Sequence, residues 1–105
     1  MIDVYKSAID NTGRFGAVFE RNAETAFFYL LDMTAPTGGR IISAFNANAI
    51  IETPAETAVS IRWHPSEVVV GLFIGGQLSA VFDLRLTTPT SRWADSEDAQ
   101  LFRAH

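Results

Sequence analysis

The chain has no cysteine among its 105 residues. That excludes disulfide bonds, a cysteine nucleophile and thiolate metal sites, and it is compatible with a reducing compartment. Histidine is nearly as scarce, because only His64 and His105 occur. A serine hydrolase would lack a convenient base, and a histidine-ligated metal site would lack ligands. We therefore expect no catalytic residues, no metal and no cofactor.

The chain also has few positively charged residues. Eight Lys and Arg stand against twelve Asp and Glu, the formal net charge is −4, and no two basic residues are adjacent. Nucleic-acid binding requires a clustered basic surface that displaces counterions from the phosphates. The sequence therefore predicts that nucleic acid is not a partner.

Long apolar runs are missing as well, although 48% of the residues are hydrophobic. No run approaches the ~20 residues that a membrane-spanning helix needs. The first fourteen residues carry Asp3 and Asp10, unlike a signal peptide. We expect no membrane association, a cytoplasmic location and one domain over residues 1–105, a usual domain length.

Short apolar runs that alternate with turn clusters predict an all-β, mainly antiparallel fold. About six strands form one curved meander that closes as a barrel or a sandwich. The strand core covers about residues 15–84, and the tail 85–105 contains a short helix opened by Asp95 or Ser96. The expected strands are Phe15–Glu20, Ala26–Asp32, Arg40–Ile51, Thr57–His64, Val68–Ile74 and Gln77–Asp83, with Ile2–Tyr5 as an additional edge strand.

Gly75 and Gly76 predict a two-residue type I′ turn, which needs positive φ at both positions. If the two strands pair from this turn without a bulge, six residues share one apolar face, which we expect in the core: Val69, Gly71, Phe73, Leu78, Ala80 and Phe82. The opposite face then carries a row of aliphatic side chains: Val68, Val70, Leu72 and Ile74. The tail, a second layer of sheet or a second subunit could cover this row. We interpret it as a candidate interface, and a homodimer as the leading case.

A second group of residues predicts a polar pocket. Glu20, Asp32 and Asp83 each end a strand, and such acids could converge at one rim of a barrel. Asn46 and Asn48 could line the same pocket, although solvent-facing positions on a half-exposed strand are the favoured reading. His64 is expected to be exposed in a turn beside Pro65. Residues 27–29, Phe-Phe-Tyr, cannot all face one way, so either both sheet faces are covered or one ring is a binding anchor. We favour burial on both sides, by the tail or by a second subunit.

The segments VFERNAETAFFYLLD, GGRIISAF and IRWHPSEVVVGLFIGGQLSAVFDL resemble a small bacterial family known as domain of unknown function 2251. The resemblance covers Phe15 to Leu84. The chain departs from the family pattern at Arg21 and Asn22, where acidic residues are expected, and at Asn46 and Asn48. The family implies no activity, so the resemblance supports the strands without adding a function.

The sequence favours a non-enzymatic module that binds another protein or a second copy of itself. An acidic immunity or antitoxin-like protein is a specialised form of this hypothesis. The alternative from another class is a small-molecule binding or catalytic barrel whose pocket uses Glu20, Asp32, Asn46, Asn48 and Asp83. A closed core with an outer apolar patch supports the first hypothesis, and a deep cavity with converging polar groups supports the second.

Overall fold

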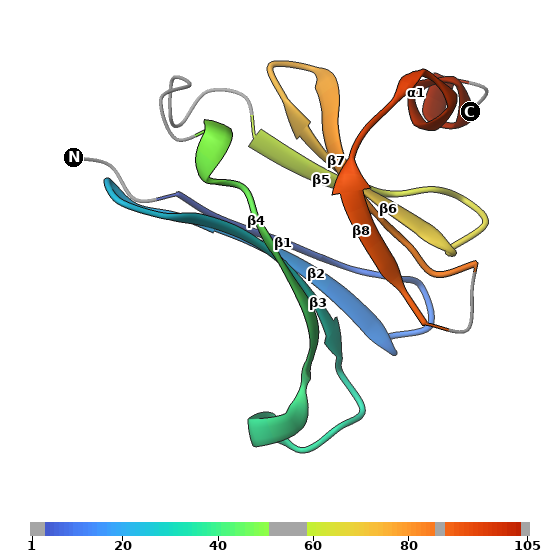
Figure 1. Ribbon diagram of the computed structural model, residues 1–105. Helices are drawn as coiled ribbons and strands as arrows, with labels where there is room; N and C mark the ends of the chain where they lie inside the picture. The colour runs from blue at the N-terminus through green and yellow to red at the C-terminus, as the bar shows by residue number, and fades with distance from the viewer. Residues whose placement is uncertain (1–3, 51–58, 86–87, 104–105) are drawn as a thin grey trace.

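The computed structural model describes residues 4–50, 59–85 and 88–103, which form two four-stranded antiparallel sheets and a C-terminal helix (Figure 1). In both sheets the strand order follows the chain, so each is a meander. The first sheet contains β1 (Val4–Ile9), β2 (Phe15–Arg21), β3 (Ala26–Asp32) and β4 (Ile41–Asn46). The second contains β5 (Val59–Trp63), β6 (Val69–Ile74), β7 (Gln77–Asp83) and β8 (Thr90–Trp93). The helix α1 spans Ser96–Arg103, and the 3-10 turns η1 and η2 span Thr37–Gly39 and Asn48–Ile50.

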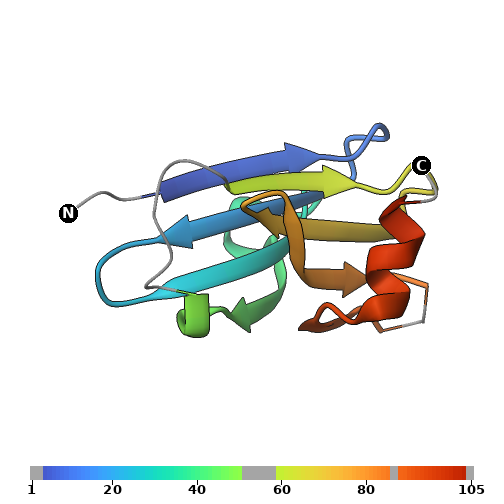
Figure 2. The same cartoon turned by 90° about the horizontal axis from the view of Figure 1, so that it is seen from above.

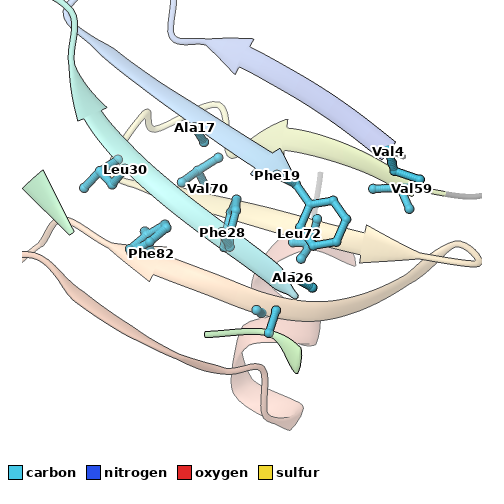
Figure 3. Close-up of a cluster of buried hydrophobic side chains, with 12 residues drawn as sticks. Val4, Ala17, Phe19, Ala26, Phe28, Leu30, Val59, Val70, Leu72 and Phe82 are labelled. Carbon is cyan, nitrogen blue, oxygen red and sulfur yellow. The ribbon is translucent and has the colours of Figure 1, made fainter. Parts of the chain in front are cut away.

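The main hydrophobic core lies between the two sheets (Figure 3). Its largest side chains are Phe19 and Phe28 from the first sheet and Leu72 and Phe82 from the second, and all four are fully buried. The rings of Phe28 and Phe82 lie 4.7 Å apart. Strands β1 and β5 run side by side where the sheets meet (Figure 2), and the Trp63 indole N–H donates to the Ala8 carbonyl at 3.1 Å. The predicted sandwich alternative is therefore confirmed, and the sheets do not close into a barrel.

A second core lies on the other face of the second sheet, beneath α1. Val69, Phe73 and Val81 pack there against Phe102 of the helix. The Phe73 and Phe102 rings meet edge to face at 5.4 Å. Both faces of β6 are therefore buried, which explains why its sequence is apolar at almost every position.

The Gly75–Gly76 turn forms as predicted, but the pairing beyond it is not regular. Both glycines have positive φ, 60° and 81°, as a type I′ turn requires. Phe73 pairs with Leu78, whereas Leu72 pairs with Ala80, so Ser79 is an extra residue on β7. Such a bulge changes which side chains share a face.

This bulge splits the set that we expected on one core face, because Leu78 packs with Val69 and Phe73 in the second core, whereas Ala80 and Phe82 lie between the sheets. The side of β6 that we expected to face outward was also wrong. Val70 and Leu72, expected on an outer row with Val68 and Ile74, are fully buried against the first sheet. Ile74 packs at the edge of that core, and Val68 packs against the second core. The first sheet thus covers Val70, Leu72 and Ile74 within the chain, and Val68 packs into the core on the helix side. The row is not a free interface.

Three other expectations need adjustment. The tail contains a strand, β8, that we did not predict, and the predicted helix does form in it. The long strand expected over 40–51 ends at Asn46 and turns into η2. The edge strand β1 continues to Ile9 rather than stopping at Tyr5. Positions 2, 51, 57 and 58, which we also assigned to strands, lie outside the described residues.

Candidate interaction surface

The first sheet has an outer face that points away from the core. Strand alternation and register place three rows of side chains on it. The rows are Tyr5–Glu20–Phe27–Asn46, Ser7–Val18–Tyr29–Ala44 and Ile9–Gly16–Leu31–Ile41. We call these twelve residues the outer face. The helix α1 lies on the second sheet, so it leaves the outer face uncovered (Figure 1).

The outer face is unusually apolar for an open surface. Tyr5, Ile9 and Ile41 expose 63%, 54% and 61% of their surface, and they are among the most exposed large hydrophobic residues described. Val18, Phe27, Tyr29 and Leu31 between them are partly exposed. Contiguous apolar patches on monomeric proteins are small and often mark binding sites, whereas scattered single residues need no explanation. The described rows are contiguous, so the outer face is a candidate interaction surface.

The two ends of the outer face differ in shape and charge. At one end Phe27 and Tyr29 stack with their ring centres 5.9 Å apart, beside Tyr5 and Glu20. At the other end Gly16 leaves an apolar hollow bordered by Ile9, Leu31, Met33 and Arg40. A Cβ at Gly16 would lie only 3.1 Å from the Met33 sulfur, so a larger residue there would fill part of the hollow.

Strand alternation in β3 explains how the three consecutive aromatic side chains of residues 27–29 are oriented. Phe28 points into the core and is fully buried, while its neighbours Phe27 and Tyr29 point to the outer face and are partly exposed. The tail does not cover these partly exposed rings, because α1 packs on the second sheet, so cover by the tail, one form of the burial that we favoured, is wrong.

An ionic cluster joins the second sheet to the helix. Arg92 on β8 contacts Asp83 on β7 and, through a bidentate pair, Asp98 on α1, with Nε–Oδ2 at 3.1 Å. The side chains of Asp83 and Asp98 are only 8% and 3% exposed. Hydrogen bonds from Arg85 hold the pKa of Asp83 far below its ordinary value. Burial raises the pKa of Asp98, but Arg92 and the Asp95 backbone N–H outweigh it and leave that pKa lowered.

The cluster also fixes the start of the helix. The Asp98 backbone N–H donates to Asp95 Oδ1 at 2.9 Å, and the Asp95 N–H donates back to Asp98 Oδ2 at 3.2 Å. This reciprocal pair is a capping box. Every charged group in it has an opposite charge or a backbone partner, so we interpret the cluster as structural.

The five residues of the predicted polar pocket do not converge. Glu20 and Asp32 lie at opposite ends of the β2–β3 hairpin, since Phe15 pairs with Asp32 and Glu20 with Phe27. Asp32 accepts hydrogen bonds from the Thr34 hydroxyl and N–H, which lower its pKa. Asp83 belongs to the other sheet and to the ionic cluster.

The two asparagines serve the chain's own backbone. Asn48 Oδ1 accepts from the Ala26 N–H at 2.7 Å, and Asn46 Oδ1 accepts from the Asn48 N–H at 2.9 Å. These bonds hold the turn that follows β4 against the start of β3. Asn46 alone of the two is also on the outer face, beside Phe27.

His64 is buried rather than exposed. It is 5% exposed, its Nδ1 lies 2.7 Å from the Ser66 hydroxyl, and its ring meets Phe102 edge to face at 5.7 Å. The sequence did not predict the cause of this burial, which is that α1 packs over the turn that holds His64. Alternation along Thr57–His64 correctly placed His64 opposite Trp63, but it did not show that both faces are covered.

Sequence reasoning missed most of the outer face. Residues 4–9, Val-Tyr-Lys-Ser-Ala-Ile, do not alternate between apolar and polar side chains, so no period-two pattern marks the full length of β1. No local signal shows that the opposite side of the first sheet would have no cover. That property depends on where α1 packs.

Two negative findings concern the described residues alone. No described helix is long and apolar enough to cross a membrane. No described group of three or more His, Asp or Glu side chains could hold a metal ion.

Comparison with known proteins gives a family and no activity. No curated protein matched the chain, and no solved structure matched it. The model of a family described as an uncharacterized protein conserved in bacteria (DUF2251) matches residues 3–101. The match extends beyond the segments in which the resemblance was first apparent and takes in β1, β8 and most of α1. The chain therefore belongs to the DUF2251 family of bacterial proteins.

Proposed function

We propose that the domain is a non-enzymatic protein-interaction module that binds its partner through the outer face of the first sheet. The observation that carries the proposal is the contiguous apolar surface around Phe27 and Tyr29, left open by the helix that covers the other sheet. Aromatic side chains on such a surface supply large contact areas at little entropic cost, as in many protein interfaces.

The alternative hypothesis, a small-molecule or catalytic pocket, gains nothing from the geometry. Its acids lie at separate places in the fold, and its asparagines hydrogen-bond to backbone groups. The hollows on the outer face are partly open to solvent, which suits contact with another protein surface better than enclosure of a ligand. The cytoplasmic location stays a prediction from the sequence.

Site-specific photo-cross-linking in bacterial cells tests the proposal. A benzophenone side chain replaces Tyr29 on the outer face, and the control carries it at Ser60, an exposed position on β5. We expect a discrete cross-linked product from position 29 and not from position 60. Equal products from the two positions, or none from position 29, would contradict the outer face as the binding surface.

A further inference from the structure

We infer that the partner of the outer face is a second copy of this chain, docked face to face about a two-fold axis that runs across the strands. The inference rests on the proposed function and specifies its partner. Three properties of the outer face support it: its size, its uneven ends and the position of its charges.

The size of the outer face suits a reversible dimer. Four strands about 4.8 Å apart and three rows about 6.6 Å apart give a patch roughly 20 Å on each side. Such a patch falls at the lower end of specific interfaces, where association is usually weak and reversible. We therefore expect a dimer that dissociates in the micromolar range.

The ends of the face decide the orientation of the two copies. Glu20 is the charged residue that alternation places on the outer face, and it lies in the row with Tyr5 and Phe27 at the aromatic end. Arg40 borders the hollow at the far end. Arg21 also lines the aromatic end, but it alternates to the opposite side of β2 from Glu20.

Two simple face-to-face arrangements exist for an isologous pair. An axis along the strands would lay the Glu20 row of each copy over the same row of the other and gather both Glu20 carboxylates at one end of the interface, and like charges in proximity are unfavourable. An axis across the strands reverses the strand direction between the copies. It brings the Glu20 end of each copy over the Arg40 end of the other.

The register gives the contacts that this axis makes. Each strand lies over its counterpart with the rows reversed, so Phe27 of one copy lies over Leu31 of the other, Tyr29 over Tyr29, and Glu20 over Gly16, at the hollow that Arg40 borders. Apolar side chains then meet apolar side chains across most of the face, and Glu20 meets the cation. The position of the charges therefore selects one orientation.

Charge reversal tests the arrangement in the intact purified chain. Sedimentation velocity over a concentration series measures the dimer dissociation constant of the unmodified chain, of Glu20→Arg, of Arg40→Glu and of the double variant. Each single change places two symmetry-related pairs of like charges in the interface, and we expect it to weaken the dimer at least tenfold. The double change restores opposite charges, and we expect it to recover most of the loss.

Each outcome has a distinct meaning. Circular dichroism first confirms that the four proteins share one fold. A monomer at all concentrations up to several hundred micromolar overturns the second copy as partner, although a cross-link from position 29 to a different protein would leave the proposed function standing. If Val18→Glu, a change on the outer face, does not weaken the dimer, the outer face is not the dimer interface. If Val18→Glu weakens the dimer but the double charge reversal does not restore its affinity, the proposed orientation is wrong.

Discussion

Single residues set the geometry of the hairpin that both cores share. Gly75 and Gly76 adopt left-handed conformations at the turn, and no atom lies within 4 Å of the position that a Cβ would take at either of them. Gly71, in contrast, is needed for space. A Cβ there would approach Leu78 Cδ1 to 2.5 Å and Phe102 Cζ to 3.1 Å. One hairpin thus uses glycine for two separate physical reasons.

Replacement of Gly76 with valine isolates the conformational reason. We expect Gly76→Val to cost about 1–2 kcal/mol, because a β-branched residue is strained at positive φ. Gly38→Val is the matched control, since Gly38 also has free space around its Cβ but no positive φ. Thermal denaturation of both variants measures the difference. Equal midpoints would show that the turn does not hold Gly76 in a left-handed conformation.

At the scale of elements, local patterns predicted most strands because alternation and turn residues are local properties. The hairpin β2–β3 formed where the sequence placed it, and α1 began at the predicted cap. The side of β6 that faces the first sheet could not be predicted, because both of its faces are apolar and buried, and the bulge at Ser79 places Ala80 and Phe82 on the face opposite Leu78 without changing the apolar pattern. Burial of His64 and exposure of Tyr5 both depend on where α1 packs, which is a tertiary property.

The helix depends on the ionic cluster, and Asp98→Asn tests this. We expect the variant to lose about 1–3 kcal/mol, because Arg92 loses a charged partner in a mostly buried site. The control is Glu97→Gln in the same first turn, an exposed residue whose change should cost at most about 0.5 kcal/mol. Urea denaturation gives both values, and equal losses would show that the Arg92 contact is not stabilising.

The pH dependence of the Asp98→Asn effect follows from the lowered pKa. A carboxylate whose folded pKa lies below its unfolded value near 3.8 adds stability above that value and loses it as the pH falls through the folded pKa. The difference between the unmodified chain and Asp98→Asn should therefore be constant above about pH 5 and shrink below about pH 4. A difference that grows on acidification would contradict the direction of the shift.

At the scale of the whole molecule, the described residues divide their apolar surface among three places. One part lies between the sheets, one lies under α1, and one remains open on the first sheet. The first two parts stabilise the fold. The third contributes nothing to the isolated chain beyond local packing, so its apolar character is better explained by association than by folding.

The same substitution at two valines separates these roles. Val70→Glu places a carboxylate between the sheets with no described charged side chain in that core to pair with it. Burial of such a group costs several kcal/mol, a large part of the ~5–15 kcal/mol that stabilises a typical domain. We expect Val70→Glu to abolish the cooperative unfolding transition.

Val18→Glu on the outer face should keep that transition within a few degrees of the original midpoint, because its carboxylate stays in contact with water. Differential scanning calorimetry of both variants decides the matter. A folded Val70→Glu chain would show that Val70 does not lie in a closed core, and an unfolded Val18→Glu chain would make the outer face part of the core rather than a surface for a partner.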